Sequence, residues 1–182
     1  MDFLASQVSS KALYAGRFAQ VHKCLGPTGR PMAVERIPPD LDPATLAKVE
    51  ATARAVGGFS HVNVLRVLHC TRGAEGGAEG GGLNVYTELV GGGSLKDVLG
   101  HFGALGERVA GWHLRQVLSA LQYLHSQAFY LGGFLVSDVR VSTQGVLKLV
   151  NAHTAPVSNG TFEDDNAKML ADLKCAGAIL EK

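Results

Sequence analysis

Apolar and polar positions alternate along the first part of the chain, as they do in strands that bury one face. The alternation runs through residues 12–37, and within it residues 25–30 contain the proline and the glycines of a turn. Residues 145–150 have the same strand-like character further along. The pattern therefore predicts a small sheet near the start of the chain and a short strand in its second half.

A change to helical spacing follows the first strands. Asp42 and Pro43 are typical of a helix start, because the carboxylate can cap free N–H groups and proline fits the first helical position. Gly57 and Gly58 end the pattern. The apolar positions of this predicted helix are Leu46, Val49, Ala53 and Val56.

A second helix is predicted in the middle of the chain. Its inward-facing positions recur at helical spacing and are Val109, Trp112, Val117, Leu121 and Leu124. Trp112 could be a platform for a ligand, but a large aromatic side chain in such a stripe is more often part of the core. We therefore expect Trp112 to be buried.

Residues 71–82 form a low-complexity insert that is dominated by glycine and alanine. Such a segment cannot bury enough apolar surface to order itself. We expect a flexible hairpin loop, with a binding role as the alternative.

Several short segments, taken in order, resemble the motifs of the protein kinase family. Residues 13–21 resemble its glycine-rich loop, although only the middle glycine, Gly16, is present. The other matches are V-A-I-K at residues 32–37, H-P-N-I-V at 61–65, a strand, hinge and G-G-S-L at 83–88 and 91–95, and Y-L-H-S at 123–126. The G-G-S-L match is similar to kinases related to the mitogen-activated protein kinase kinase kinases.

This resemblance implies an α+β, two-lobed protein-kinase-like fold. Residues 1–88 would form a small β-sheet lobe with one C-helix, and residues 89–182 would form a hinge and a truncated, mainly helical large lobe.

Five positions that carry kinase chemistry hold the wrong residue type. The nucleotide-binding lysine of V-A-I-K is replaced by Glu35, whose carboxylate repels phosphate. By spacing, the catalytic base becomes Gly133 and a phosphate-steadying lysine becomes Leu135. The asparagine that would hold a second magnesium ion becomes Asp138, and the metal-binding aspartate of D-F-G becomes Asn151.

These changes predict a catalytically inactive domain. Phosphoryl transfer depends on positioning and charge neutralisation, and one lost group typically costs roughly 10²–10³-fold in rate. Arg140 replaces the apolar floor of the adenine site, where its guanidinium could stack on a purine or block the pocket. Ordinary Mg·ATP binding is therefore disfavoured, although a vestigial nucleotide cleft would be lined by Gly16, Val21, Ala33, Thr87, Glu88, Leu89 and Arg140.

Glu50 is the candidate for the C-helix glutamate that pairs with the lysine in a kinase. If it faces Glu35, the usual ion pair becomes a like-charge pair. The alternative is that Glu50 is a solvated surface residue.

Residues 172–181 resemble the central helix of the kinase large lobe, D-x-W-S-x-G-x-I-L-x-E. The stretch between His153 and Asp172 is too short for a full activation segment and contains no A-P-E. We expect this helix, without its usual cover, to expose apolar residues such as Ile179 and Leu180.

Composition agrees with a globular protein, since the 182 residues are 46% apolar and 18% charged. The net charge of +1 gives no reason to expect binding to nucleic acid or to a membrane. The three cysteines and seven histidines lack metal-site spacing, so we expect no metal, free thiols and a cytoplasmic location.

The sequence therefore predicts a pseudokinase of serine/threonine type that acts as a regulatory or scaffolding binding module, with another protein, such as an active kinase, as its partner. The alternative is a serine/threonine kinase-like protein that binds ATP and retains residual or atypical phosphotransfer. A third hypothesis is a fragment without function, which stable expression would argue against.

Overall fold

The computed structural model describes residues 7–73, 81–150, 152–155 and 161–179, and the chain divides into two compact units. Residues 1–59 and 66–89 form the first, here called the sheet unit. Residues 60–65 and 90–182 form the second, the helical unit. The chain is α+β, as the motifs predict, with a five-stranded sheet and one helix in the sheet unit and mainly helices in the helical unit.

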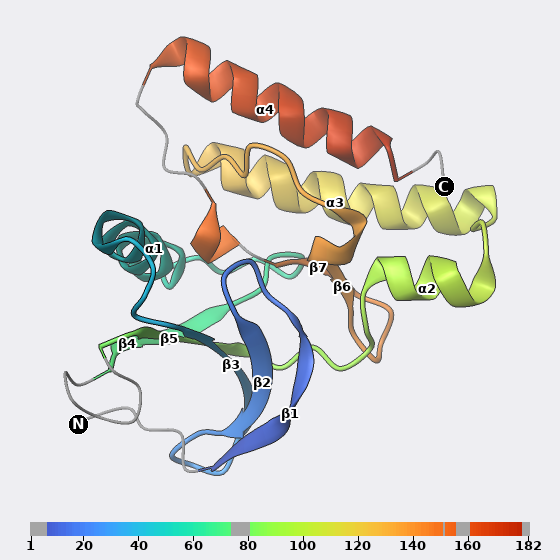
Figure 1. Ribbon diagram of the computed structural model, residues 1–182. Coiled ribbons are helices and arrows are strands. Elements are labelled where there is room, and N and C mark those ends of the chain that lie inside the picture. Colours follow the sequence, from blue (N-terminus) through green and yellow to red (C-terminus); the bar gives the residue numbers. More distant parts are fainter. Residues whose placement is uncertain (1–6, 74–80, 151, 156–160, 180–182) are drawn as a thin grey trace. The chain divides into compact units, whose positions relative to one another are not determined.

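An antiparallel five-stranded sheet forms the body of the sheet unit (Figure 1), in the order β1-β2-β3-β5-β4. Its strands are β1 (Gln7–Ala15), β2 (Gln20–Leu25), β3 (Pro31–Ile37), β4 (Val67–Arg72) and β5 (Leu83–Glu88). The strands predicted within residues 12–37 are confirmed, and β1 begins earlier than the alternation suggested. Register shifts in the pairing of β1 with β2 explain why its pattern is irregular.

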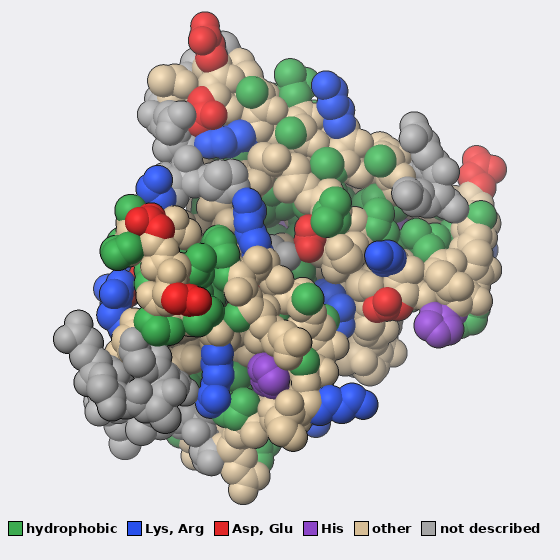
Figure 2. All heavy atoms as spheres, viewed as in Figure 1, with side chains coloured by type: hydrophobic (Ala, Val, Ile, Leu, Met, Phe, Trp, Pro, Cys, Tyr) green, Lys and Arg blue, Asp and Glu red, His purple; other side chains and the backbone are tan. Residues whose placement is uncertain are grey.

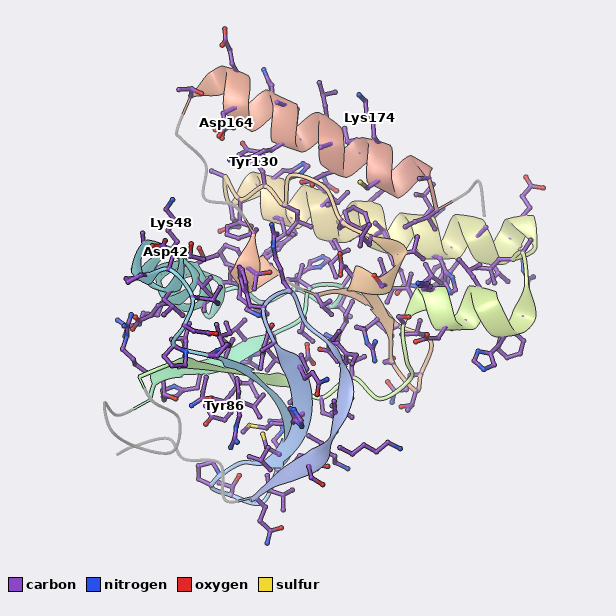
Figure 3. All side chains as sticks on the ribbon, in the orientation of Figure 1. Asp42, Lys48, Tyr86, Tyr130, Asp164 and Lys174 are labelled. Atoms are coloured by element: carbon purple, nitrogen blue, oxygen red, sulfur yellow. The ribbon has the colours of Figure 1, made fainter. Side chains whose placement is uncertain are left out.

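Helix α1 (Pro43–Val56) begins and ends as its local sequence predicts. The Asp42 carboxylate, which Figure 3 shows at the start of the helix, accepts a 2.9 Å hydrogen bond from the Thr45 N–H, and Gly57 is the C-terminal cap. This hydrogen bond to the backbone lowers the pKa of Asp42. All four predicted apolar positions are buried, and the helix packs against β4 and β5.

One apolar cluster of the sheet unit lies on a single face of the sheet. Its buried members are Cys24, Met32, Val34 and Tyr86, and Val8 and Leu68 pack against them. Figure 3 labels Tyr86 on β5. Residues two apart on one strand share a face, so the odd-numbered positions of β3, including Glu35, point to the opposite side.

The hairpin between β4 and β5 is shorter than the predicted insert. Thr71 and Arg72 belong to β4, and the Gly73 N–H donates a 2.7 Å hydrogen bond to the Gly82 carbonyl. Residues 74–80, the rest of the glycine-rich insert, lie outside the described residues.

The helical unit contains α2 (Leu95–Phe102), α3 (Glu107–Ser126) and α4 (Phe162–Gly177). Two short strands, β6 (Val139–Val141) and β7 (Leu147–Leu149), pair as a hairpin, and single 3₁₀ turns form η1 (Val136–Asp138) and η2 (Ala152–Thr154). Helix α4 lies along α3 (Figure 1), and β7 packs against α3. The hairpin confirms the strand-like reading of residues 145–150.

Residues 60–65 belong to the helical unit because their polar groups bond within it. The buried Asn63 amide donates to Gln116 Oε1 and to the Leu147 carbonyl, at 3.0 and 2.9 Å. The His61 ring stacks on Tyr123 with 4.9 Å between ring centroids. The segment is thereby attached to α3 and β7.

Helix α3 confirms part of its predicted inward face and corrects the rest. Val117, Leu121 and Leu124 are buried as expected. Trp112 is 59% exposed and Val109 is 44% exposed, so the prediction that they belong to the core is wrong. Burial on α3 begins at His113, and the described part of the chain leaves the first turns of the helix uncovered on this side.

Helix α4 also exposes apolar side chains, but not the predicted ones. Ile179 is buried, which contradicts the expectation, and Leu180 lies outside the described residues. Leu170 and Leu173 are exposed instead, and Figure 2 shows hydrophobic side chains at the surface over α4. The side of α4 that carries the fully buried Asp172 faces the interior of the helical unit, whereas Leu170 and Leu173 lie on its exposed side.

Candidate functional site

Glu35 is buried on β3, and its carboxylate contacts the turn between β1 and β2. Oε1 accepts hydrogen bonds from the backbone N–H groups of Phe18 and Ala19, both at 3.2 Å. The side chain is only 3% exposed. The carboxylate at the position that the resemblance assigns to the kinase lysine is therefore bound to the segment that resembles the glycine-rich loop.

Gly16 is the residue that lets this turn approach the carboxylate. Its N–H donates a 2.8 Å hydrogen bond to the Ala19 carbonyl, which closes the turn. A Cβ atom at position 16 would clash with Glu35 Oε1 and would lie 2.7 Å from the Ala19 oxygen. Glycine is needed here for space, because every other side chain would displace the turn or the carboxylate.

Three of the other predicted cleft residues of the sheet unit, Val21, Ala33 and Thr87, lie on the same face of the sheet as Glu35. Val21 pairs with Glu35 across β2 and β3, and Ala33 pairs with Thr87 across β3 and β5, so all four share one face and all are buried. Glu88 accepts a 2.9 Å hydrogen bond from the Arg66 N–H through its carboxylate. Leu89, half-buried, ends the unit.

Glu50 pairs with arginines of its own unit. Its carboxylate oxygens lie 2.6 Å from Arg54 and 2.6 Å from Arg72, so it connects α1 to β4. With a side chain only 17% exposed and two guanidinium groups that compensate its charge, Glu50 is not a fully solvated residue, and that alternative is corrected. That Glu50 faces Glu35 stays a prediction.

In the helical unit, Gly133, which the resemblance assigns to the position of the catalytic base, has a left-handed backbone, with φ of 105°. Its N–H donates a 2.7 Å hydrogen bond to Oδ1 of Asp172, and the Leu131 N–H donates a 3.0 Å bond to Oδ2. His125 Nε2 lies 2.9 Å from the same Oδ2. The fully buried Asp172 therefore holds the loop at residues 131–133 through its backbone.

Asp138, the one acidic residue at a metal-binding position of the motif, is engaged in a local turn. Its Oδ2 accepts a 2.8 Å hydrogen bond from the Leu135 N–H, and its own N–H donates to the Leu135 carbonyl at 2.8 Å. The Leu135 side chain is 68% exposed. Asn151 lies outside the described residues.

Arg140 lies on β6 beside the start of α2. Its backbone forms an isolated antiparallel β-bridge with that of Ser94, and only 8% of the residue is exposed. Hydrogen bonds from the Ser94 N–H and hydroxyl lower the pKa of Asp97, and the positive charge of Arg140 adds to this effect. Arg140, which the resemblance assigns to the floor of the adenine site, is therefore buried near a carboxylate of its own unit.

The first turns of α3 form a second candidate surface, here called the α3 face. The lining of a surface cavity of about 900 Å³ includes Val109 and Trp112, with Arg108 and Arg115 on the same side. Tryptophan and arginine are enriched among the residues that dominate protein interfaces. The sequence pattern did not indicate this surface, because a tryptophan in a helical apolar stripe is typical of a core residue.

Asp172 is a fully buried residue whose contacts the motifs did not predict. Its place in the segment that resembles the central helix of the kinase large lobe was visible in the sequence, but no local pattern indicates its contacts with residues 131–133.

Among the described residues, His, Cys, Asp and Glu form no cluster that could hold a metal ion. Within the same residues, no helix combines the length and apolar character that a membrane crossing requires.

The known proteins to which this chain is similar in sequence include protein kinases. A probable serine/threonine-protein kinase of Dictyostelium discoideum is 33% identical over 138 residues, which cover 75% of this chain and 27% of that protein. Mitogen-activated protein kinase kinase kinase 3 of Homo sapiens is 31% identical over 144 residues, covering 76% of this chain and 22% of that protein. No family model matches the chain.

A solved structure shows the same fold. The crystal structure of Rad53 residues 1–466 in complex with AMP-PNP has a TM-score of 0.78 and 20% sequence identity, and the match covers 99% of this chain and 47% of that one. Over most of its length the chain is similar to protein kinases, and these relatives include serine/threonine and mitogen-activated protein kinase kinase kinases at about 30% identity. It spans about a quarter of the length of the curated relatives named above.

Proposed function

We propose that this chain is a catalytically inactive protein-kinase-like domain, a pseudokinase, that acts as a regulatory or scaffolding module. The observation that carries the proposal is Gly133. The position of the catalytic base has no side chain, its φ of 105° is unfavourable for an aspartate, and its N–H is bound to the buried Asp172. A proton acceptor cannot be supplied from this loop position.

Two further positions support inactivity. A phosphoryl group in transfer needs cations that neutralise its charge, and Glu35 places a carboxylate where the family has a lysine. Asp138 accepts a hydrogen bond from a neighbouring backbone N–H. Each lost group costs roughly 10²–10³-fold, and although such effects do not multiply simply, three altered positions leave no route to measurable turnover.

The partner, on this proposal, is another protein, and an active kinase of the same family is the first candidate. The α3 face suits such a role, because Trp112 offers a large apolar anchor between Arg108 and Arg115. We place the protein in the cytoplasm, in agreement with its three free cysteines.

The alternative is an ATP-binding domain with residual or atypical phosphotransfer. Its support is the family itself, because the relatives bear the names of serine/threonine kinases and the Rad53 structure contains AMP-PNP. A binding assay and an activity assay separate the two proposals.

The test of inactivity is a phosphotransfer assay with γ-labelled ATP, Mg²⁺ and a general protein substrate, on the purified chain and on Glu35→Lys. We expect no labelled product from either protein, because restoring the lysine leaves Gly133 without a side chain. A kinase from the same family, purified in parallel, controls for the assay. Transfer by the Glu35→Lys variant above that of a no-enzyme blank would overturn the proposal.

A further inference from the structure

The turn between β1 and β2 presents two successive backbone N–H groups to one point. Phe18 and Ala19 both donate to Glu35 Oε1, and the Gly16 N–H closes the turn on the Ala19 carbonyl. Consecutive N–H groups that converge in this way form a concavity, a nest, that binds anions. The carboxylate that fills it comes from a strand that is not adjacent in sequence.

We infer that the β1–β2 turn is an anion-binding nest and that the Glu35 carboxylate is its resident anion. The sheet unit is thus self-ligated at this point, and phosphate groups are kept out of the nest by occupancy as well as by charge. This inference holds whether or not the domain regulates another kinase, because it rests only on contacts within the sheet unit.

The geometry favours the internal anion over one from solution. Glu35 is held on β3, which pairs with β2 along the strand that follows the turn, so its carboxylate is delivered to the nest without loss of translational freedom. The carboxylate is buried, and hydrogen bonds from N–H groups to an ionised oxygen are stronger than bonds to a neutral one. An external phosphate would have to displace this carboxylate and then lie beside it.

Gly16 and Glu35 form one structural unit in this account. The carboxylate can enter the nest only because position 16 has no Cβ, and the turn keeps its shape in part because the carboxylate binds its N–H groups. Removing the carboxylate should therefore leave the two donors in place but open to solvent. The vacated nest would accept a small anion such as phosphate or tripolyphosphate.

The test compares four versions of the 182-residue chain: the native chain, Glu35→Gln, Glu35→Ala and the control Glu107→Ala, which removes an exposed carboxylate from α3. Amide hydrogen exchange of Phe18 and Ala19 is followed by NMR, and sodium tripolyphosphate without Mg²⁺ is the titrant. In Glu35→Ala we expect exchange of both amides to accelerate at least about tenfold, and saturable tripolyphosphate shifts at both. The native chain and the control should show neither.

Glu35→Gln keeps an oxygen in the nest but removes its charge, so it provides a test even if Glu35→Ala does not fold. We expect its Phe18 and Ala19 amides to exchange about fivefold faster than those of the native chain, because neutral acceptors hold N–H groups less strongly. Equal exchange in the native chain and Glu35→Gln would overturn the inference. Tripolyphosphate shifts at these amides in the native chain, or their absence in a folded Glu35→Ala protein, would also overturn it.

Discussion

Replacing Asp172 by alanine should destabilise the helical unit strongly. The carboxylate is fully buried and contacts three groups: the N–H of Leu131, the N–H of Gly133 and the ring of His125, at 3.0, 2.7 and 2.9 Å. Alanine leaves two backbone donors without an acceptor, and each costs about 1–3 kcal/mol when it is buried. With the lost histidine contact, the free energy of unfolding should fall by about 3–5 kcal/mol.

That loss corresponds to a fall in melting temperature of about 10 °C for a chain of this size, at roughly 2–4 °C per kcal/mol. Thermal unfolding followed by circular dichroism measures it, and hydrogen exchange at Leu131 and Gly133 locates it. Glu163→Gln is the matched control, because Glu163 is an exposed carboxylate in the first turn of the same helix, and it should cost less than about 1 kcal/mol. A melting temperature of Asp172→Ala within 2 °C of the control would refute the reasoning.

Three further predictions concern single side chains. Gly16→Ala should lower the free energy of unfolding by about 2 kcal/mol or more, and by less in a Glu35→Ala background. A double-mutant cycle of urea unfolding should give a coupling energy above roughly 0.5 kcal/mol, and additive effects would contradict the contact between the two positions. Trp112→Ala should change the free energy of unfolding by less than about 0.5 kcal/mol, because the residue is 59% exposed. The same variant should bind a partner kinase more weakly in a binding assay. Unchanged binding would remove the α3 face from the proposal. Burial, with a smaller contribution from the charge of Glu50, raises the pKa of the Cys70 thiol to about 11, so only about a thousandth of it is thiolate at pH 8. The rate of its alkylation by iodoacetamide, followed by mass spectrometry, should rise steeply towards pH 11. Fast labelling at pH 8 would contradict this prediction.

The parts of the fold that were predicted correctly depend on local sequence. Helix α1 was predicted because Asp42, Pro43 and the glycines at its end specify a helix within a few residues. The strands around Glu35 were predicted because alternation persists through them. The motifs that resemble protein kinases added the order in which these elements assemble.

What local sequence could not give was which faces are covered and which distant groups meet. Helical spacing predicts which residues of α3 share a face, but it does not tell whether other parts of the chain pack on the first turns of the helix. Trp112 was therefore expected in the core, although it is exposed. The contact of Glu35 with the Phe18 and Ala19 N–H groups joins segments that are paired only in the folded sheet. The arginines around Glu50 and the anchoring by Asp172 are tertiary contacts of the same kind.

The most direct test of the central proposal is a thermal-shift titration of the purified chain with ATP, with and without Mg²⁺. A ligand that binds only the folded state stabilises it by RT ln(1 + [L]/Kd), which is about 2.7 kcal/mol at 100 times Kd. We predict no saturable shift in the cooperative melting of the chain at millimolar ATP under either condition. A saturable, Mg²⁺-dependent rise in melting temperature would contradict the account, and it would favour the alternative of an ATP-binding domain.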